Sequence, residues 1–307
     1  MNPLNKQLKI GIVGCGALGG YYGGMLANAG FNVHFLLGQH FEAVKKNGLK
    51  VTSPNGDFHL TKINAYKTPE EIGKMDYVFV GLKTTANDQF KTLITPLVAA
   101  HTRIISAQNG LGNEEMLSHL FGAKKISGAL AFLCSNRSDD GTICHLDFGH
   151  IHLGNYQGAV DDVLETFCDI LVASEVKCKT VPCLTTERWR KLMWNIPFNG
   201  LSTLLDTTVD KIMQSPPLRQ RAYIMLKETY NAATALQLSI DPTFIDTMMA
   251  YTDKMTPYYT SMHLDVKASR TPEIESILGA PIACAKRIGF EMPESEKVYT
   301  ALKEKYL

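Results

Sequence analysis

The sequence predicts an α/β protein with a parallel sheet in its N-terminal part and an all-helical C-terminal part. Three observations support this fold class. Short apolar runs alternate with helical stretches in the first half of the chain, which is typical of strand–helix–strand units. A glycine-rich turn follows the first apolar run and precedes a helical stretch. From about Thr186 onward, apolar residues recur at three- and four-residue spacing, as they do on the packed faces of helices.

The elements of the N-terminal part are expected in the alternating order of a parallel α/β sheet. They are strands over 9–14, 32–37, 76–82 and 103–107, with helices over 21–29 and 86–100. Gly30 is the stop signal of the first helix. The run over 76–82 is apolar throughout, which predicts a strand that is buried on both faces.

The rest of the chain is expected to contain first strands and then only helices. Strands over 126–134, 142–153 and 176–181, without long helices between them, indicate an antiparallel extension at a sheet edge. Helices are expected over 218–238 and 242–255, followed by one that Thr271-Pro272 opens and Gly289 ends. The boundary falls near 181–186, so we expect two domains, 1–183 and 184–307. Two domains also fit a length of 307 residues at about 150 residues per domain.

Composition and charge exclude several classes of protein. The chain has 45% hydrophobic and 20% charged residues and a formal net charge of +1, so no overall field favours nucleic acid or an acidic membrane. No apolar run approaches the roughly 18 residues that span a bilayer. The polar N-terminus, 1–9, lacks the apolar core of a signal peptide. We therefore expect a cytoplasmic protein with no nucleic-acid or membrane partner.

Neither a metal ion nor a disulfide is expected. The seven cysteines are scattered and include no C-x-x-C pair, which fits small buried hydrophobic residues in a reducing compartment. His150 and His152 alternate along an expected strand and so face the same side. Because a third ligand is not evident, structural histidines are favoured over a metal site.

The glycine-rich turn has the spacing of a dinucleotide-binding motif. Its residues are Gly14, Cys15, Gly16, Ala17, Leu18 and Gly19. Gly14 permits the tight turn, Gly16 lets the backbone approach a pyrophosphate, and Gly19 lets the helix pack closely on the strand. The amides at the start of the helix then bind the pyrophosphate. The motif alone is a weak signal, but the strands and helix around it favour a Rossmann-type dinucleotide-binding domain.

The ends of the other expected strands bear on the cofactor. After the second strand, an acidic residue binds the ribose of NAD, whereas an arginine accommodates the 2′-phosphate of NADP. This chain has Leu37-Gly38-Gln39-His40, which offers neither. Gln108-Asn109-Gly110 follows a later parallel strand, and open α/β sheets bind ligands at such strand ends.

Two clusters of polar residues lie in the helical part. Lys191, Asn195 and Asn199 are spaced four apart, so they form one stripe along a helix. Ser261 precedes Glu273 by twelve residues, and Glu273 is expected in the first turn of a helix. Each cluster also has a plain structural explanation, since the stripe could be solvated surface and the helix dipole favours a carboxylate at Glu273.

Taken together, these motifs resemble the ketopantoate reductase family (2-dehydropantoate 2-reductases) over nearly the whole chain. The resemblance in the N-terminal part rests on the glycine motif, Gly81-Leu82-Lys83, Gln108-Asn109-Gly110 and the segment 141–154. In the helical part it rests on Trp189-Arg190-Lys191 with Asn195 and Asn199, and on Ser261-Met262 with 270–275. Several separated motifs in the same order are far more specific than a glycine loop.

The resemblance implies an NADPH-dependent reduction of a small 2-oxo acid, 2-dehydropantoate, to pantoate, a step of pantothenate biosynthesis. It implies that Lys191 is the general acid and that Glu273 binds substrate and helps to order the lysine. It further implies substrate-binding roles for Asn195, Asn199 and Ser261, and cofactor-binding roles for Lys83 and Asn109 beside the glycine motif.

Two departures from the family pattern bear on cofactor and substrate. The family usually has an arginine at the position of Gly38, and losing one such charge-assisted contact costs roughly 1.5–3 kcal/mol. His40, Lys45 and Lys46 are candidates to compensate, so NADPH is still favoured over NADH. Over 204–210 the chain lacks an asparagine that some members have, so another branched 2-oxo acid is an alternative substrate.

A nicotinamide-nucleotide sensor without catalysis is the alternative from a different class. Gly38 is compatible with it, but a binding module has no use for a proton donor such as Lys191. The apolar stripes of the helical part are compatible with a homodimer and equally with an internal core.

Overall fold

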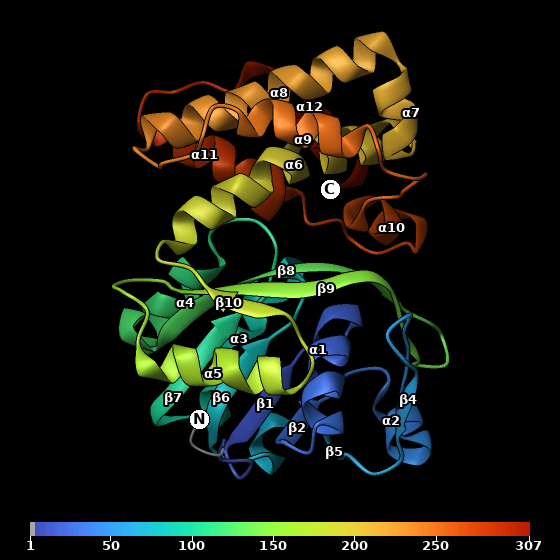
Figure 1. Cartoon of the computed structure of the whole chain (residues 1–307), viewed down its shortest axis with the longest axis vertical. Helices are drawn as coiled ribbons and strands as arrows, with labels where there is room; N and C mark the ends of the chain where they lie inside the picture. Colours follow the sequence, from blue (N-terminus) through green and yellow to red (C-terminus); the bar gives the residue numbers. More distant parts are fainter. Residues whose placement is uncertain (1–3) are drawn as a thin grey trace. The chain divides into compact units, whose positions relative to one another are not determined.

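The computed structural model of the chain describes residues 4–307. These residues form two compact units. The first comprises the chain up to Gln108 together with Asn113–Leu184, and the second comprises Asn109–Gly112 and Thr185–Leu307. Figure 1 shows the sheet of the first unit and the helices of the second. Among the described residues, no helix combines the length and the apolar character that crossing a membrane requires.

Within the described residues, the first unit is built on a 10-stranded sheet in the order β4-β3-β9-β8-β7-β6-β1-β2-β5, with β10 beside β9. The strands are β1 (Lys9–Val13), β2 (Asn32–Leu36), β3 (Leu49–Thr52), β4 (Phe58–Leu60), β5 (Asn64–Tyr66), β6 (Met75–Val80), β7 (Val98–Ser106), β8 (Ile126–Arg137), β9 (Ile143–Asn155) and β10 (Cys178–Thr180). All pairs from β5 through β2, β1, β6 and β7 to β8 are parallel, which confirms the predicted α/β sheet.

Helix α1 (Ala17–Asn28) packs against the sheet and begins earlier than the predicted residue 21. Its glycines explain its close packing. A Cβ at Gly20 would lie 2.5 Å from Cδ1 of Ile143, and one at Gly23 would lie 2.7 Å from the Phe35 ring. Residues that resemble a loop in sequence are therefore the contact face of a helix.

The single helix predicted over 86–100 is wrong. The structure has a 3₁₀ helix at Thr84–Gln89, a short helix α3 at Phe90–Ile94 and a 3₁₀ turn at Thr95–Leu97. Ala86 has non-helical backbone angles (φ −111°), and Pro96 lacks the N–H that a continuing helix needs. Strand β7 consequently begins at Val98, five residues before its predicted start at Arg103.

The region predicted as an antiparallel edge is only partly so. Strands β8 and β9 are antiparallel, but β3 and β10 both pair with β9 in parallel. A helix that the sequence analysis missed, α5 (Asp162–Ala173), follows β9 and precedes β10 in the chain. Its start is capped by Asp161, which accepts from the Leu164 amide at 3.0 Å.

The thiols of Cys168 and Cys178 are adjacent, with their sulfurs 3.1 Å apart, so the cysteines are less scattered than their spacing suggests.

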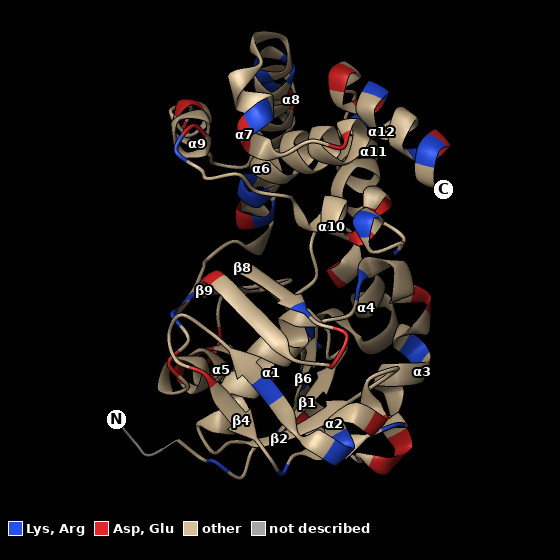
Figure 2. Ribbon diagram, turned by 90° about the vertical axis from the view of Figure 1, so that its right-hand side faces the viewer, with Lys and Arg blue, Asp and Glu red and all other residues tan. Residues whose placement is uncertain are grey.

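The second unit is all helical over its described residues, as predicted. Its helices are α6 (Leu184–Leu205), α7 (Val209–Gln214), α8 (Pro216–Ala235), α9 (Phe244–Thr252), α10 (Ser261–Lys267), α11 (Ala280–Arg287) and α12 (Pro293–Tyr306), with a π-helical turn at Glu275–Gly279. The helix predicted to open at Pro272 starts only at that π-helical turn, but Gly289, at φ +75°, follows its end as predicted. Figure 2 shows acidic and basic residues on α12, with acids in its first turn and lysines in its last, as the helix dipole favours.

Candidate active site

Three of the predicted cofactor-binding positions follow adjacent parallel strands. Gly14 follows β1, Lys83 lies three residues beyond β6, and Asn109 lies three residues beyond β7. Strands β1, β6 and β7 are neighbours in parallel register, so their carboxyl ends share one edge of the sheet, where open α/β sheets bind ligands. Gln108 links the segments after β6 and β7, because its Nε2 donates to Oδ1 of Asn87 at 2.7 Å.

The glycine cradle, defined as Gly14–Gly19, has the shape that a dinucleotide requires. Gly14 has φ +90°, and a Cβ there would lie 2.5 Å from the backbone nitrogen of Leu82. A Cβ at Gly19 would lie 2.1 Å from the carbonyl oxygen of Gly14. Gly16 differs, because it is exposed and a Cβ there would meet no described atom within 4 Å. Backbone atoms therefore crowd Gly14 and Gly19, whereas Gly16, the open front of the cradle, leaves space for a pyrophosphate to approach closely.

The remaining cradle residues place backbone amides at the start of α1. Gly16 is the N-cap residue, and Ala17 and Leu18 begin the helix, where the first amides have no partner within the helix. The first turn of α1 contains no acidic residue, so its amides and dipole favour an anion. Cys15 is buried, and burial raises the pKa of its thiol to about 11, so the thiol is neutral.

In the second unit, Lys191 lies on α6 with its amine bound to a side chain from a distant part of the sequence. Its Nζ donates to Oδ1 of Asn109 at 2.7 Å. Burial of the amine, and next the charge of Arg188, lower the pKa of Lys191 to about 7, while Glu273 acts in the opposite direction. The residue as a whole is half-buried. Such a shift is typical of lysines that exchange protons near neutral pH.

Asn109 is fixed against the π-helical turn that follows Glu273. The amide of Leu111 donates to the carbonyl oxygen of Ser276 at 2.9 Å. Gly110 has φ +82°, and a Cβ there would lie 2.1 Å from the same oxygen, so only glycine allows this approach. This contact with Ser276 explains why residues 109–112 belong to the second unit although they follow strand β7 of the first. It brings Asn109, Lys191 and Glu273 into one unit.

The predicted substrate-binding residues lie farther along α6 and at the start of α10. Asn195 and Asn199 are buried on the stripe of α6 that carries Lys191. Oδ1 of Asn199 accepts from the amide of Met262 at 3.3 Å, which ties α6 to the first turn of α10. Ser261 is the half-buried first residue of that helix. Lys83, in contrast, is exposed and belongs to the first unit.

Of the two charges that act on Lys191, the sequence predicted Glu273 but not Arg188. Arg188 is buried and precedes Lys191 by one helical turn, so that the two cations lie on neighbouring positions of α6. The i, i+3 spacing of two cations was a signal available in the sequence. The bond between Asn109 and Lys191 had no such signal, since 82 residues separate the two.

A second cluster of the same unit has the residue types of a hydrolase triad. His263 is hydrogen-bonded through Nδ1 to Ser202 Oγ at 3.0 Å and through Nε2 to Asp206 at 2.7 Å. Ser202 is fully buried, and its hydroxyl donates to the carbonyl oxygen of Thr207 at 2.7 Å. A nucleophile must reach a substrate, so this cluster is structural and holds the end of α6 to α10.

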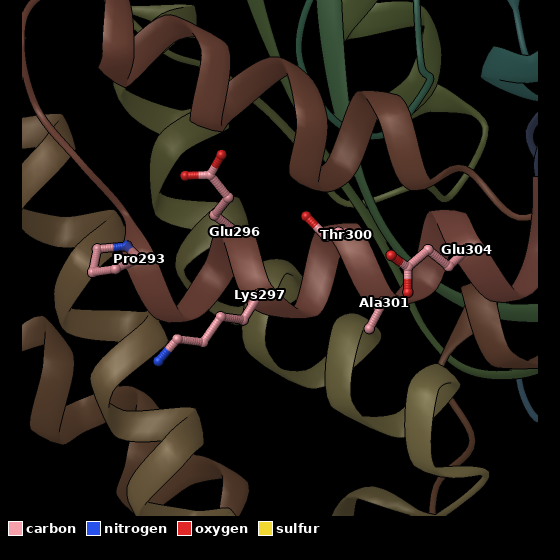
Figure 3. A pocket seen from close by; sticks show the side chains of 6 residues that line it. All are labelled: Pro293, Glu296, Lys297, Thr300, Ala301 and Glu304. Carbon is pink, nitrogen blue, oxygen red and sulfur yellow. The ribbon is translucent and has the colours of Figure 1, made fainter.

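Figure 3 shows a surface pocket formed by one face of α12. It is lined by Pro293, Glu296, Lys297, Thr300, Ala301 and Glu304. Lys297 pairs with Glu294 at 3.2 Å, and Glu296 pairs with Lys286. The pocket contains none of the residues predicted for the site, and two of its charged residues, Glu296 and Lys297, already take part in ion pairs.

Comparison with known proteins gives one consistent family. The family model "Ketopantoate reductase PanE/ApbA" matches residues 10–158, and its C-terminal model matches residues 184–306. A 2-dehydropantoate 2-reductase from Nostoc sp. is 40% identical over 304 residues, which are 97% of this chain and 95% of that protein. The crystal structure of 2-dehydropantoate 2-reductase from Geobacter metallireducens is 44% identical, covers 97% of this chain and 100% of that chain, and has a TM-score of 0.95. A ternary structure of D-mandelate dehydrogenase with NADH and anilino(oxo)acetate has a TM-score of 0.89 over 97% of this chain and 98% of that chain, but at 20% identity it shares the fold alone.

Proposed function

The chain belongs to the ketopantoate reductase family, and on that premise we propose that it reduces 2-dehydropantoate to pantoate with NADPH, using Lys191 as the general acid. It is a nicotinamide-dependent oxidoreductase whose product enters pantothenate biosynthesis. The observation that carries the proposal is the shielded amine of Lys191, bound to Asn109, with a pKa of about 7.

The reaction needs a hydride at carbon and a proton at oxygen. When bound, the nicotinamide supplies the hydride to the carbonyl carbon of the 2-oxo acid. Lys191 donates its proton to the carbonyl oxygen, so that the ketone becomes a hydroxyl group and the lysine is left neutral. Until then its positive charge stabilises the negative charge that develops on that oxygen. A pKa of about 7 keeps the acid close to the operating pH, where proton transfer is efficient.

The substrate roles follow from the polar stripe of α6. In this proposal Asn195, Asn199 and Ser261 bind the carboxylate and hydroxyl groups of the acid, and Glu273 orders Lys191. Support comes from the burial of both asparagines on the stripe of Lys191. The bond from the Met262 amide to Asn199 also fixes the start of α10, where Ser261 lies. Buried amides are retained where they have defined partners, which suits orientation of a small acid.

The cofactor is assigned to the glycine cradle, with Lys83 at the same sheet edge and Asn109 beside Lys191. The cradle supports a dinucleotide because its front is open at Gly16 and its amides begin α1. We place NADPH before NADH because residues 37–41 contain no carboxylate to bind the ribose hydroxyls of NAD.

The test is steady-state oxidation of NADPH and of NADH by the purified protein with 2-dehydropantoate as substrate. Turnover with NADPH preferred is the expected result. Turnover with a different branched 2-oxo acid, in a panel that includes 2-dehydropantoate, would move the substrate assignment within the same chemistry. Cofactor binding without turnover on any acid of the panel would overturn the proposal in favour of a nucleotide sensor.

We expect kcat to fall as the pH rises through about 7. The general acid must carry its proton, and the fraction of protonated Lys191 decreases above its pKa. The measurement is kcat at saturating NADPH and substrate from pH 5.5 to 9. A profile that stays flat up to pH 9 would contradict the assignment of this lysine as the acid.

Two substitutions should shift the descending limb of this pH profile, the range over which kcat falls, in opposite directions. Arg188→Met removes a charge that lowers the pKa of Lys191, so the limb should shift to higher pH. Glu273→Gln removes the carboxylate that raises it, so the limb should shift to lower pH. Both variants are expected to lose activity, so the position of the limb, and not the maximal rate, is the readout. Shifts of the same sign in both variants would contradict the electrostatic account.

A further inference from the structure

A half-buried arginine, Arg137, lies beside the glycine cradle, and two of its guanidinium nitrogens have no hydrogen-bond partner among the described residues. Arg137 ends β8, and its Nη1 donates to the carbonyl oxygen of Cys15 in the cradle. Its Nε and Nη2 are buried and have no hydrogen-bond partner among residues 4–307. A guanidinium has five N–H donors, three of them on these two nitrogens.

The sheet register fixes where this guanidinium lies. Arg137 pairs with Ile143 across the antiparallel β8–β9 ladder, and directly paired residues face the same side of a sheet. Ile143 contacts α1 at Gly20, so Arg137 lies on the α1 face. A Cβ at Gly141 would lie 3.6 Å from Nη2 of Arg137 and 3.9 Å from Val44. The guanidinium therefore lies between the start of α1 and helix α2 (Phe41–Asn47), which follows β2.

The acidic residues of the adjacent turn do not pair with it. Asp140 instead accepts from Ser138 at 2.5 Å and from Thr142 at 3.0 Å. Asp139 is exposed, and its charge partly offsets the lowering of the pKa of His40. Shielding a charge from water without a counter-ion is unfavourable, and Nε and Nη2 of Arg137 are shielded in this way. These two nitrogens are therefore available to an anion that the described residues do not provide.

The other cations suggested by the sequence are less suitable. Burial, and next the charge of Arg137, lower the pKa of His40, so the imidazole is neutral at pH 7. Lys45 and Lys46 are exposed in the last turn of α2, at the end remote from β2, and Lys45 lies 5.0 Å from the centre of the Phe41 ring.

We propose that Arg137 recognises the adenosine 2′-phosphate of NADP, in place of the arginine that this chain lacks at Gly38. In a Rossmann-type domain the adenosine ribose lies at the end of the second strand, and Arg137 lies between the cradle and the helix that follows β2. Its Nε and Nη2 form the edge of the guanidinium that binds phosphate through two parallel hydrogen bonds. The inference rests on the proposed use of NADPH.

The test compares nucleotide affinities of Arg137→Gln and the unaltered full chain by isothermal titration with NADPH and with NADH, without substrate. We expect the Kd for NADPH to rise about 10- to 150-fold and the Kd for NADH to change less than about threefold. Lys50→Gln is the matched control, because it removes an exposed cation from strand β3, two positions from β8 in the same sheet, and should leave both affinities unchanged. Arg137→Lys keeps the charge and should retain part of the NADPH preference even if the glutamine variant folds poorly.

Two results would overturn the inference. Equal weakening of NADPH and NADH binding would assign Arg137 to the pyrophosphate, which both nucleotides carry. Unchanged affinity for both would leave it a purely structural contact of the cradle. Failure of the proposed function is distinguishable, because a protein that binds NADPH through Arg137 but turns over no 2-oxo acid keeps this inference and loses only the reaction.

Discussion

Replacing Lys191 with alanine is expected to lower kcat about 100- to 10,000-fold, the range that general acid catalysis supplies. The loss has two causes, since the variant lacks both the proton donor and the charge that stabilises the developing oxyanion. The Kd for NADPH should change little, because the proposal assigns nucleotide binding to the glycine cradle and assigns Lys191 to the carbonyl oxygen of the substrate.

The measurement combines steady-state NADPH oxidation with direct titration of NADPH. Lys211→Ala is a suitable control, because Lys211 is an exposed lysine of α7 in the same unit. That variant should retain full turnover. If Lys191→Ala kept more than about a tenth of the unaltered kcat, Lys191 could not be the general acid, since that role contributes at least about 100-fold.

Alanine at Gly19 and at Gly16 should produce opposite kinds of damage. At Gly19 the new Cβ would lie 2.1 Å from the Gly14 carbonyl oxygen, a backbone atom that cannot move without opening the cradle. We expect a loss of about 3 kcal/mol or more in the free energy of unfolding, at the upper end of overpacking costs. At Gly16 the space is open, so stability should stay within about 0.5 kcal/mol, as for surface substitutions.

The Gly16 variant should lose nucleotide affinity and not stability. The methyl group at Gly16 would occupy the side from which a pyrophosphate approaches, so NADPH affinity should fall about tenfold or more although the protein is folded. Urea denaturation measures the stability of both variants, and isothermal titration measures their affinities. A Gly16→Ala protein with unchanged affinity would mean that the nucleotide does not lie against the front of the cradle.

Local patterns made most of the fold predictable. The glycine spacing after β1, the apolar run of β6 and the stripe of Lys191, Asn195 and Asn199 are all short-range signals, and each is found on the expected type of element. The errors are also local. The helix over 86–100 failed at Pro96, and α5 was missed although Asp161 has the side chain of a helix cap.

The sequence by itself determined the type of domain, the glycine cradle and the helix that carries the lysine, because these depend on residues within a few positions of one another. The tertiary structure alone decided which groups surround that lysine and that cradle. Asn109 meets Lys191 across 82 residues, and Arg137 meets Cys15 across 122. Hydrogen bonds over such separations follow from sheet order and helix packing, which no periodicity in the sequence encodes. The same is true of the lowered pKa of Lys191, because its main cause, burial, exists only once the chain has folded.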